Sequence, residues 1–239
     1  MNTDKEKIYK NILMIMTKEG HDHYIQQQLE SKPIVNFLKK EDNLLVICFS
    51  GAKKTHHKRT DLENTINLHL SGKECYGRLA EKTFKSIQYL TKNFNFKTLH
   101  KGDDTKKIPE NYCFETEMDY GGFSNWNHTR DATKKMKIHP RWIVDGDRFV
   151  AKGLRQTSAK SFQKWARKKF MKIDSWFLDR HVWYSSWKPY FMSRRFCELI
   201  AEGGEGYADI YIEKLGGCED HMIGKIFKDL AIYARLKHE

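Results

Sequence analysis

The sequence contains little proline and no stretch typical of a linker. Only 4 prolines occur among its 239 residues, and no Pro/Gly/Ser-rich segment or internal repeat interrupts the chain. Boundaries between domains usually fall in linkers rich in such residues. The sequence therefore predicts a single domain over residues 1–239.

Long apolar runs and paired cysteines are also missing. No run approaches the roughly 18 to 20 apolar residues that a membrane-spanning helix needs, and the N-terminus lacks the pattern of a signal peptide. The cysteines have no CxxC spacing and stand singly, at Cys48, Cys75, Cys113, Cys197 and Cys218. Single thiols favour a reducing compartment over a disulfide framework or a zinc ribbon. We therefore expect a soluble, cytoplasmic chain without a transmembrane segment.

Apolar and charged residues are both plentiful. Hydrophobic residues make up 39% of the chain, aromatic residues 13% and charged residues 31%, which permits a sizeable core and excludes wholesale disorder. Lys and Arg outnumber Asp and Glu by 43 to 31, so the net charge is +12. Such a field concentrates anions, and nucleotides, nucleic acids and anionic lipids all fit it. An ordinary solvated basic surface fits it equally.

The N-terminal region shows two apolar patterns. Residues 1–40 predict a helical segment, because apolar residues recur near every third or fourth position at Ile8, Ile12, Leu13, Ile15 and Met16. Residues 43–50 form a short run of strand-forming residues that ends at Ser-Gly, which predicts a buried strand entering a loop.

Two more helices and a second strand are expected next. Asp61 is placed to cap a helix that carries apolar residues at Leu62, Ile66 and Leu70. Helical spacing returns over 74–94, and a short strand over 96–105 ends in acidic residues. This order predicts an α/β fold with a mostly parallel central sheet flanked by helices. Such sheets bind ligands beyond the carboxyl ends of their strands.

The second half of the chain has a clear pattern only near its end. Residues 188–204 predict a short strand that turns into a helix stopped by two glycines, and 219–236 predict a final helix. The run 160–172 alternates cations with aromatic residues. This run suits phosphate contacts with base stacking, and it suits an amphipathic helix whose aromatic residues face the core.

Two acidic pairs are candidates for chemistry, Asp103-Asp104 at a strand end and Glu219-Asp220 at a helix start. Carboxylates at a strand end can chelate a hard divalent cation that bridges to a diphosphate. A carboxylate at a helix start can act as a general base or merely cap the helix. His221, directly after the second pair, can bind diphosphate or metal or be structural. Two further pairs of potential metal ligands lack an identifiable partner: His21 with His23, and His56 with His57.

Four motifs occur in a fixed order along the chain. A helix reads Glu74-Cys-Tyr76-Gly-Arg-Leu79-Ala-Glu-Lys82-Thr83, and a strand end reads Lys101-Gly102-Asp103-Asp104-Thr105. Tyr190-Phe191-Met192-Ser193 opens a helix, and Glu219-Asp220-His221-Met222-Ile223-Gly224 follows. This order resembles the GT-A glycosyltransferases of the fringe and β-1,3-galactosyltransferase group. The resemblance covers roughly residues 44–232, with little support between 106 and 183.

Two positions depart from the family's pattern. Thr105 stands where the family has a third aspartate, often the direct metal ligand. Either Asp104 takes the metal instead, or metal dependence is weakened. The glycine that usually precedes the Tyr-x-x-Ser segment is absent before Tyr190, so the acceptor pocket is expected to differ.

The resemblance implies a single GT-A-like domain that transfers a sugar, with inversion, from a nucleotide-sugar donor such as a UDP-sugar. Residues 41–110 would bind the donor and 111–239 the acceptor. Mn²⁺ or Mg²⁺ would neutralise the leaving diphosphate. In the family the aspartate of Glu-Asp-x-x-x-Gly is the base. The implied roles are: base, Asp220; acceptor orientation, Glu219; metal, Asp103, Asp104 and His221; donor binding, Asp103, Asp104, Lys82 and Lys101.

The acceptor stays open at this point. Family precedent indicates a hydroxyl on a glycan or lipid-linked saccharide, with the basic surface against an anionic membrane or polymer. Hydroxymethylated DNA is the competing acceptor, as in virus-encoded DNA glycosyltransferases, because the same basic surface would hold its phosphates. Two other classes fit the residues: a metal-dependent nuclease that uses both acidic pairs, and a non-catalytic nucleic-acid-binding protein.

Overall fold

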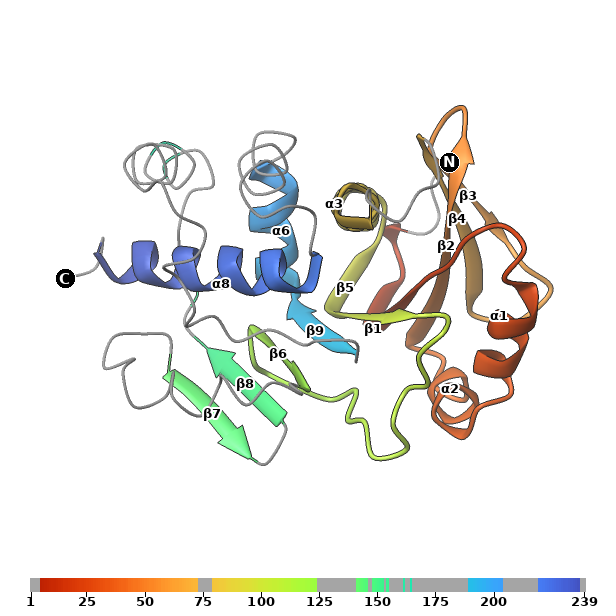
Figure 1. The fold of residues 1–239 in the computed structure, drawn as a ribbon, viewed down its shortest axis with the longest axis horizontal. Coiled ribbons are helices and arrows are strands. Elements are labelled where there is room, and N and C mark those ends of the chain that lie inside the picture. The colour runs from red at the N-terminus through yellow and green to blue at the C-terminus, as the bar shows by residue number, and fades with distance from the viewer. Residues whose placement is uncertain are drawn as a thin grey trace.

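The fold is built on one long β-sheet with helices on both of its faces (Figure 1). The computed structural model describes residues 5–72, 79–123, 141–145, 148–152, 189–203 and 219–236, with the single residues 154, 161 and 164. The elements along the described chain are β1 (Ile8–Met16), α1 (Asp22–Leu29), α2 (Lys32–Leu38), β2 (Asn43–Ala52), β3 (His56–Arg59), β4 (Thr65–Ser71), α3 (Leu79–Asn93), β5 (Asn95–Asp103), β6 (Tyr120–Phe123), β7 (Arg141–Asp145), β8 (Arg148–Lys152), β9 (Tyr190–Ser193), α6 (Arg194–Gly203) and α8 (Glu219–Leu236).

The strands hydrogen bond in the order β3-β4-β2-β1-β5-β9-β6-β8-β7. The stretch β4-β2-β1-β5 is parallel. Its connections run through α1 and α2 from β1 to β2, through β3 from β2 to β4, and through α3 from β4 to β5. The expected α/β class is therefore confirmed, whereas the mostly parallel sheet is corrected to a mixed one. Among the described strands, three neighbouring pairs are parallel and five are antiparallel. Short strands such as β6 and β9 carry no sequence signal of their direction, because strand patterning is the same in both orientations.

Two expected helices are strands instead. Within the expected helical segment 1–40, residues Ile8–Met16 form β1 at the centre of the parallel part, and the helices begin only at Asp22. A central strand is buried on both faces, so its apolar run lacks the alternation that separates strand from helix. The helix expected after Asp61 is β4, whose Thr65–Ser71 alternate between buried and half-buried positions. The apolar residues of this segment, Ile66, Leu68 and Leu70, recur at every second position, as in a strand, and Ile66 and Leu70 also fit helical spacing.

The other predicted elements are confirmed within the described residues. The strand at 43–50 is β2, the later helix is α3, and the strand ending in acidic residues is β5. The strand that turns into a helix is β9 with α6, and Glu219 begins α8. Of the run 160–172, only Ser161 and Lys164 are described, and both are exposed; the other cations and the aromatic residues of the run lie outside the described residues. No described helix is both long enough and apolar enough to cross a membrane.

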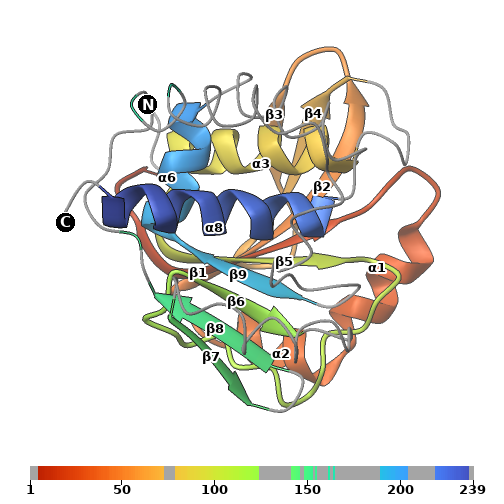
Figure 2. The same ribbon diagram turned by 60° about the vertical axis from the view of Figure 1, so that its left-hand side comes forward.

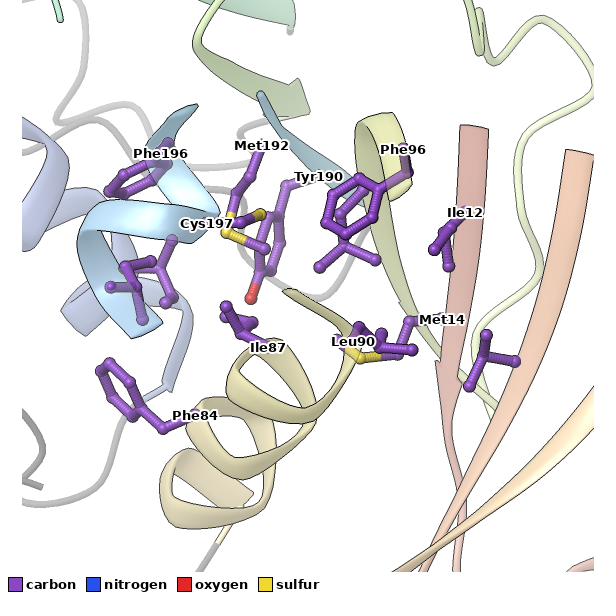
Figure 3. Close-up of a cluster of buried hydrophobic side chains, with 14 of the residues drawn as sticks. Ile12, Met14, Phe84, Ile87, Leu90, Phe96, Tyr190, Met192, Phe196 and Cys197 are labelled. Carbon is purple, nitrogen blue, oxygen red and sulfur yellow. The ribbon is translucent and has the colours of Figure 1, made fainter. Parts of the chain in front are cut away.

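Helices α3, α6 and α8 cover one face of the sheet, and α1 and α2 cover the other (Figure 2). The larger core lies under α3, α6 and α8, where Figure 3 shows Tyr190 of β9 among side chains of α3, α6 and β5. The smaller core joins Leu13 and Ile15 of β1 to Ile34 and Phe37 of α2. Burial of apolar area on both faces, about 25 cal/mol per Å², fixes which side of each strand meets which helices.

Candidate functional site

The strand order reverses between β1 and β5. From β1 the chain crosses to β2 and then β4 on one side, and α3 returns it to β5 on the other side of β1. Met16 and Asp103, the last residues of β1 and β5, are partners in the register. The carboxyl ends of strands at such a reversal leave a crevice between their diverging connections. The predicted acidic pair Asp103-Asp104 lies at this point.

The two acidic motifs meet at Lys101. Its Nζ lies 2.9 Å from Oδ1 of Asp103, 2.9 Å from Oε2 of Glu219 and 3.8 Å from Oδ1 of Asp220. Lys101 and Glu219 are 118 positions apart in the sequence. The Tyr190 hydroxyl donates to Oε1 of Glu219, and the Lys101 ammonium lies 5.6 Å from the centre of the Tyr190 ring. We call these five residues the Lys101 cluster.

The sequence explains how the Lys101 cluster forms. Lys101 and Asp103 are two positions apart on β5, so both point to the face that α8 covers. Tyr190 is the register partner of Lys101 on β9. Glu219 and Asp220 occupy the first turn of α8, where the helix dipole favours negative charge.

Burial divides the Lys101 cluster into an inner and an outer part. The side chains of Lys101 and Glu219 are 2% and 1% exposed, whereas those of Asp103 and Asp220 are 31% and 20% exposed. The inner pair is therefore a buried ion pair, and the two aspartates are the carboxylates that a ligand can reach.

Electrostatics in the cluster separates the two acids of α8. Burial would raise the pKa of Glu219, but Lys101 beside it and the hydrogen bonds it accepts hold that pKa below its ordinary value. Burial and the neighbouring Glu219 charge raise the pKa of Asp220 well above its ordinary value. Burial opposes the charge of Lys101, yet Asp103, Glu219 and Asp220 together raise its pKa well above the usual range. Glu219 thus stays ionised, and Asp220 has a strong affinity for a proton.

Asp104 points away from this cluster, toward α1. Its Oδ2 accepts a 2.6 Å hydrogen bond from Thr17 and lies 2.7 Å from Nδ1 of His21. Its backbone N–H donates to the carbonyl of Met16, and its carbonyl accepts a hydrogen bond from Gln28. Because a carboxylate accepts, Nδ1 of His21 carries the shared proton. Asp104 therefore ties β5 to the segment that joins β1 to α1.

The remaining predicted site residues are placed as follows. Lys82 of α3 is buried, and its ammonium donates to the carbonyl of Thr17 at the end of β1. His221 lies in α8, but its side chain is outside the described residues. The structure thus joins Asp103 to Glu219 and Asp220, and it gives Asp104 and Lys82 contacts with the end of β1.

A divalent cation would find suitable but incomplete ligation here. In the described part of the chain, no three His, Cys, Asp or Glu side chains form a ready metal site. Mg²⁺ and Mn²⁺ at nucleotide sites are often held by one or two carboxylates together with phosphate oxygens and waters. Asp103 fits that role by its exposure. Three carboxylates around one ammonium also leave a formal charge of −2 when all are ionised, which a divalent ion would balance.

Sequence reasoning did not place Thr17 or His21 in the site. Both lie between β1 and α1, and the helix predicted over residues 1–40 left out the strand end that brings them to Asp104. It also did not foresee the central position of Lys101. The spacing of Lys101 and Asp103 on a strand was the signal for the latter.

Comparison with known proteins adds no family assignment. Neither a scan against protein-family models nor a search of curated proteins gave a match for this chain.

Proposed function

We propose that this chain is a metal-dependent glycosyltransferase that moves a sugar from a nucleotide-sugar donor to an acceptor hydroxyl with inversion. The observation that carries the proposal is the meeting of Asp103, Glu219 and Asp220 around Lys101 at the reversal of strand order. A chelating carboxylate and a second carboxylate that can accept the proton of the acceptor hydroxyl are the two groups that this chemistry needs. The resemblance in motif order supports the same reaction.

The reaction assigns a separate task to each carboxylate. The acceptor oxygen forms a bond to the anomeric carbon, the bond from that carbon to the diphosphate breaks, and the diphosphate leaves with the electron pair. Asp220 takes the acceptor proton in its ionised form, which Lys101 at 3.8 Å favours. Burial and the Glu219 charge raise the pKa of Asp220, which makes that ionised form a stronger base. Asp103 would hold the divalent ion, which neutralises charge on the leaving diphosphate when bound.

Lys101, Glu219 and Tyr190 position these two groups. Lys101 holds Asp103 and lies within 4 Å of Asp220, so it fixes the separation between the two carboxylates. Glu219 keeps Lys101 charged and in place by a 2.9 Å contact. Tyr190 fixes the second oxygen of Glu219.

The test is diphosphate release from a panel of nucleotide sugars with Mn²⁺, in the presence of glycan and DNA acceptors. We expect Asp220→Asn to retain donor binding and to lower turnover by about 10²-fold or more. Asp103→Asn should weaken Mn²⁺-dependent donor binding by roughly tenfold or more. The control is Asp42→Asn, the same chemical change at an exposed position before β2.

Three outcomes would contradict the proposal. Sugar transfer by Asp220→Asn at the wild-type rate would show that Asp220 is not the base. Wild-type donor affinity in Asp103→Asn would show that Asp103 does not bind the metal. Cleavage of DNA by the wild-type protein with Mg²⁺ and no nucleotide sugar would indicate a nuclease instead.

A further inference from the structure

The edge of the sheet farthest from β7 carries a dense group of cations. Lys53 and Lys54 follow the end of β2, and Lys58 and Arg59 lie on the edge strand β3. All four side chains are exposed, and no acidic residue interrupts the segment 53–59. Figure 1 shows β3 at the rim of the sheet, beyond β4 and β2.

Three aromatic rings are stacked across the neighbouring strands on the same part of the sheet. Phe49 of β2 and His69 of β4 have ring centres 5.3 Å apart and planes within 14°. His69 and His56 of β3 have ring centres 5.0 Å apart and planes within 13°. His56 is the outermost ring and is exposed. Its outer face can extend the stack by one more flat ring, such as a nucleobase.

Protection of a sheet edge explains only part of this arrangement. Cations on an edge strand discourage pairing with another chain, and Lys58 and Arg59 can serve that purpose. Lys53 and Lys54 precede the strand and contribute nothing to its edge. The ring stack likewise protects no backbone group. Both features are expected of a surface that holds phosphates and bases together.

A membrane surface fits the same segment less well. Binding to an anionic bilayer is strengthened by apolar side chains that enter it. The exposed apolar side chain nearest in sequence is Leu62, in the turn after β3, and it stands between Asp61 and Glu63. An anionic surface repels both of those carboxylates.

We propose that Lys53, Lys54 and Lys58, with the stacked ring of His56, form a binding surface for nucleic acid. The lysines contact phosphates, and His56 stacks on an unpaired base. None of these four residues belongs to the run 160–172.

The position of this surface relates it to the Lys101 cluster. Lys53 and Lys54 follow the carboxyl end of β2, and Asp103 lies at the carboxyl end of the parallel strand β5, so they are at the same end of the strands. Four strand spacings separate β3 from β5, or about 19 Å. Exposed Lys18, Lys106 and Lys107 follow the carboxyl ends of β1 and β5 at this end of the sheet. A nucleic acid held at β3 therefore reaches Asp103 and Asp220. On the proposed function, on which this step rests, the nucleic acid is the acceptor.

The first experiment measures binding of a fluorescein-labelled single-stranded DNA of about 20 nucleotides, by anisotropy, between about 50 and 200 mM salt. The variant is Lys53→Gln, Lys54→Gln and Lys58→Gln together. Its matched control replaces three other exposed lysines and loses the same charge: Lys39→Gln, Lys92→Gln and Lys97→Gln.

We expect the slope of log affinity against log salt to become shallower by about two units in the first triple variant, since each phosphate contact on a single strand contributes about 0.7. The control should change the slope by less than about half a unit. Equal changes in both variants would show a solvated basic surface without a site and overturn the proposal. Absence of binding by the wild-type protein would overturn it as well.

A second variant tests the stacked ring. His56→Ala should weaken single-stranded DNA binding by about five- to a hundredfold, the range for losing one base stack, while leaving the salt slope unchanged. Unchanged affinity would remove the stacking contact. Binding of phosphatidylserine vesicles that is lost in the lysine variant, with DNA binding intact, would assign the surface to a membrane instead.

The binding assay needs neither donor nor metal, so its outcome is independent of transfer. DNA binding without diphosphate release from any donor would leave the surface in place and contradict the glycosyltransferase. Transfer to glycans by a protein that does not bind DNA would contradict the surface and leave the enzyme.

Discussion

Replacing Lys101 by methionine tests the charge arrangement on which the candidate site depends. Methionine keeps much of the length of lysine but removes the ammonium that lies 2.9 Å from both Asp103 and Glu219. The two aspartates of the Lys101 cluster are partly exposed, so water compensates for much of their loss. Glu219 is 1% exposed and would keep the hydroxyl of Tyr190 and its hydrogen bond with Asp220, but no cation.

The expected loss follows from the burial of Glu219. Removing one partner of a buried ion pair costs about 3–5 kcal/mol, because the other charge stays buried without compensation. Lys85→Met is the matched control, since Lys85 lies 2.7 Å from Glu81 in a pair with both side chains about one-third exposed. That surface pair should contribute about 0–1 kcal/mol. The double variant Lys101→Met/Glu219→Gln should recover most of the loss.

Urea unfolding at pH 7 and pH 5 measures both the loss and its cause. In the wild-type protein Lys101 holds the pKa of Glu219 down, so the stability contributed by this group is present at pH 7 and is lost as pH falls through its folded-state pKa. Without Lys101, burial raises that pKa, and protonation of Glu219 relieves the penalty as pH falls. The difference between wild type and Lys101→Met should therefore narrow toward pH 5. A loss no larger than that of Lys85→Met, or a difference independent of pH, would refute this account.

Local patterns predicted α3 from its helical spacing, and they predicted β2, which is buried on both faces, from a run of strand-forming residues that ends at Ser-Gly. Helix α3 buries one stripe and leaves the rest of its surface mostly half-buried, and its helical spacing was correct from Leu79 onward. The helix predicted where β1 lies was wrong, because both faces of this strand are covered, by α3 with α6 on one side and by α1 with α2 on the other. An apolar run such as Ile8–Met16 carries no period that distinguishes strand from helix. Only its pairing with β2 and β5 settles its structure.

The candidate site shows the same division. The pairs Asp103-Asp104 and Glu219-Asp220 could be picked out in the sequence as candidate site residues, because each pair stands next to a predicted strand end or helix start. Their meeting at Lys101 depends on packing α8 over the face of β5, which no local pattern specifies. Asp103 is the last residue of β5, two positions after Lys101, and so lies on the same face as Lys101. Asp104 begins the turn after the strand and contacts His21 instead.

Three further predictions concern groups outside the Lys101 cluster. Burial raises the pKa of the Cys48 thiol to about 12, whereas Cys113 is exposed. Iodoacetamide should therefore modify Cys113 in the native protein and leave Cys48 unmodified, as measured by mass spectrometry. Modification of both thiols at one rate would contradict the structure. Asp104→Asn should lower the free energy of unfolding by about 1–3 kcal/mol, because Thr17 and His21 lose a charged hydrogen-bond acceptor. Amide hydrogen exchange in the segment between β1 and α1 should become faster for the same reason. Exchange rates equal to those of the wild type would show that Asp104 does not hold this segment. The last prediction concerns buried His100, whose pKa is lowered by burial to about 3, against an ordinary value of about 6.5. Between these two values the unfolded chain binds a proton at this position and the folded chain does not, so the free energy of unfolding should fall by up to about 1.4 kcal/mol for each pH unit below about 6.5. His100→Gln removes this difference, so its urea unfolding at pH 7, 6 and 5 should depend less steeply on pH than that of the wild type, even though the variant is less stable at pH 7. Parallel pH profiles for the two proteins would show that His100 takes up its proton in the folded state and that the burial argument is wrong.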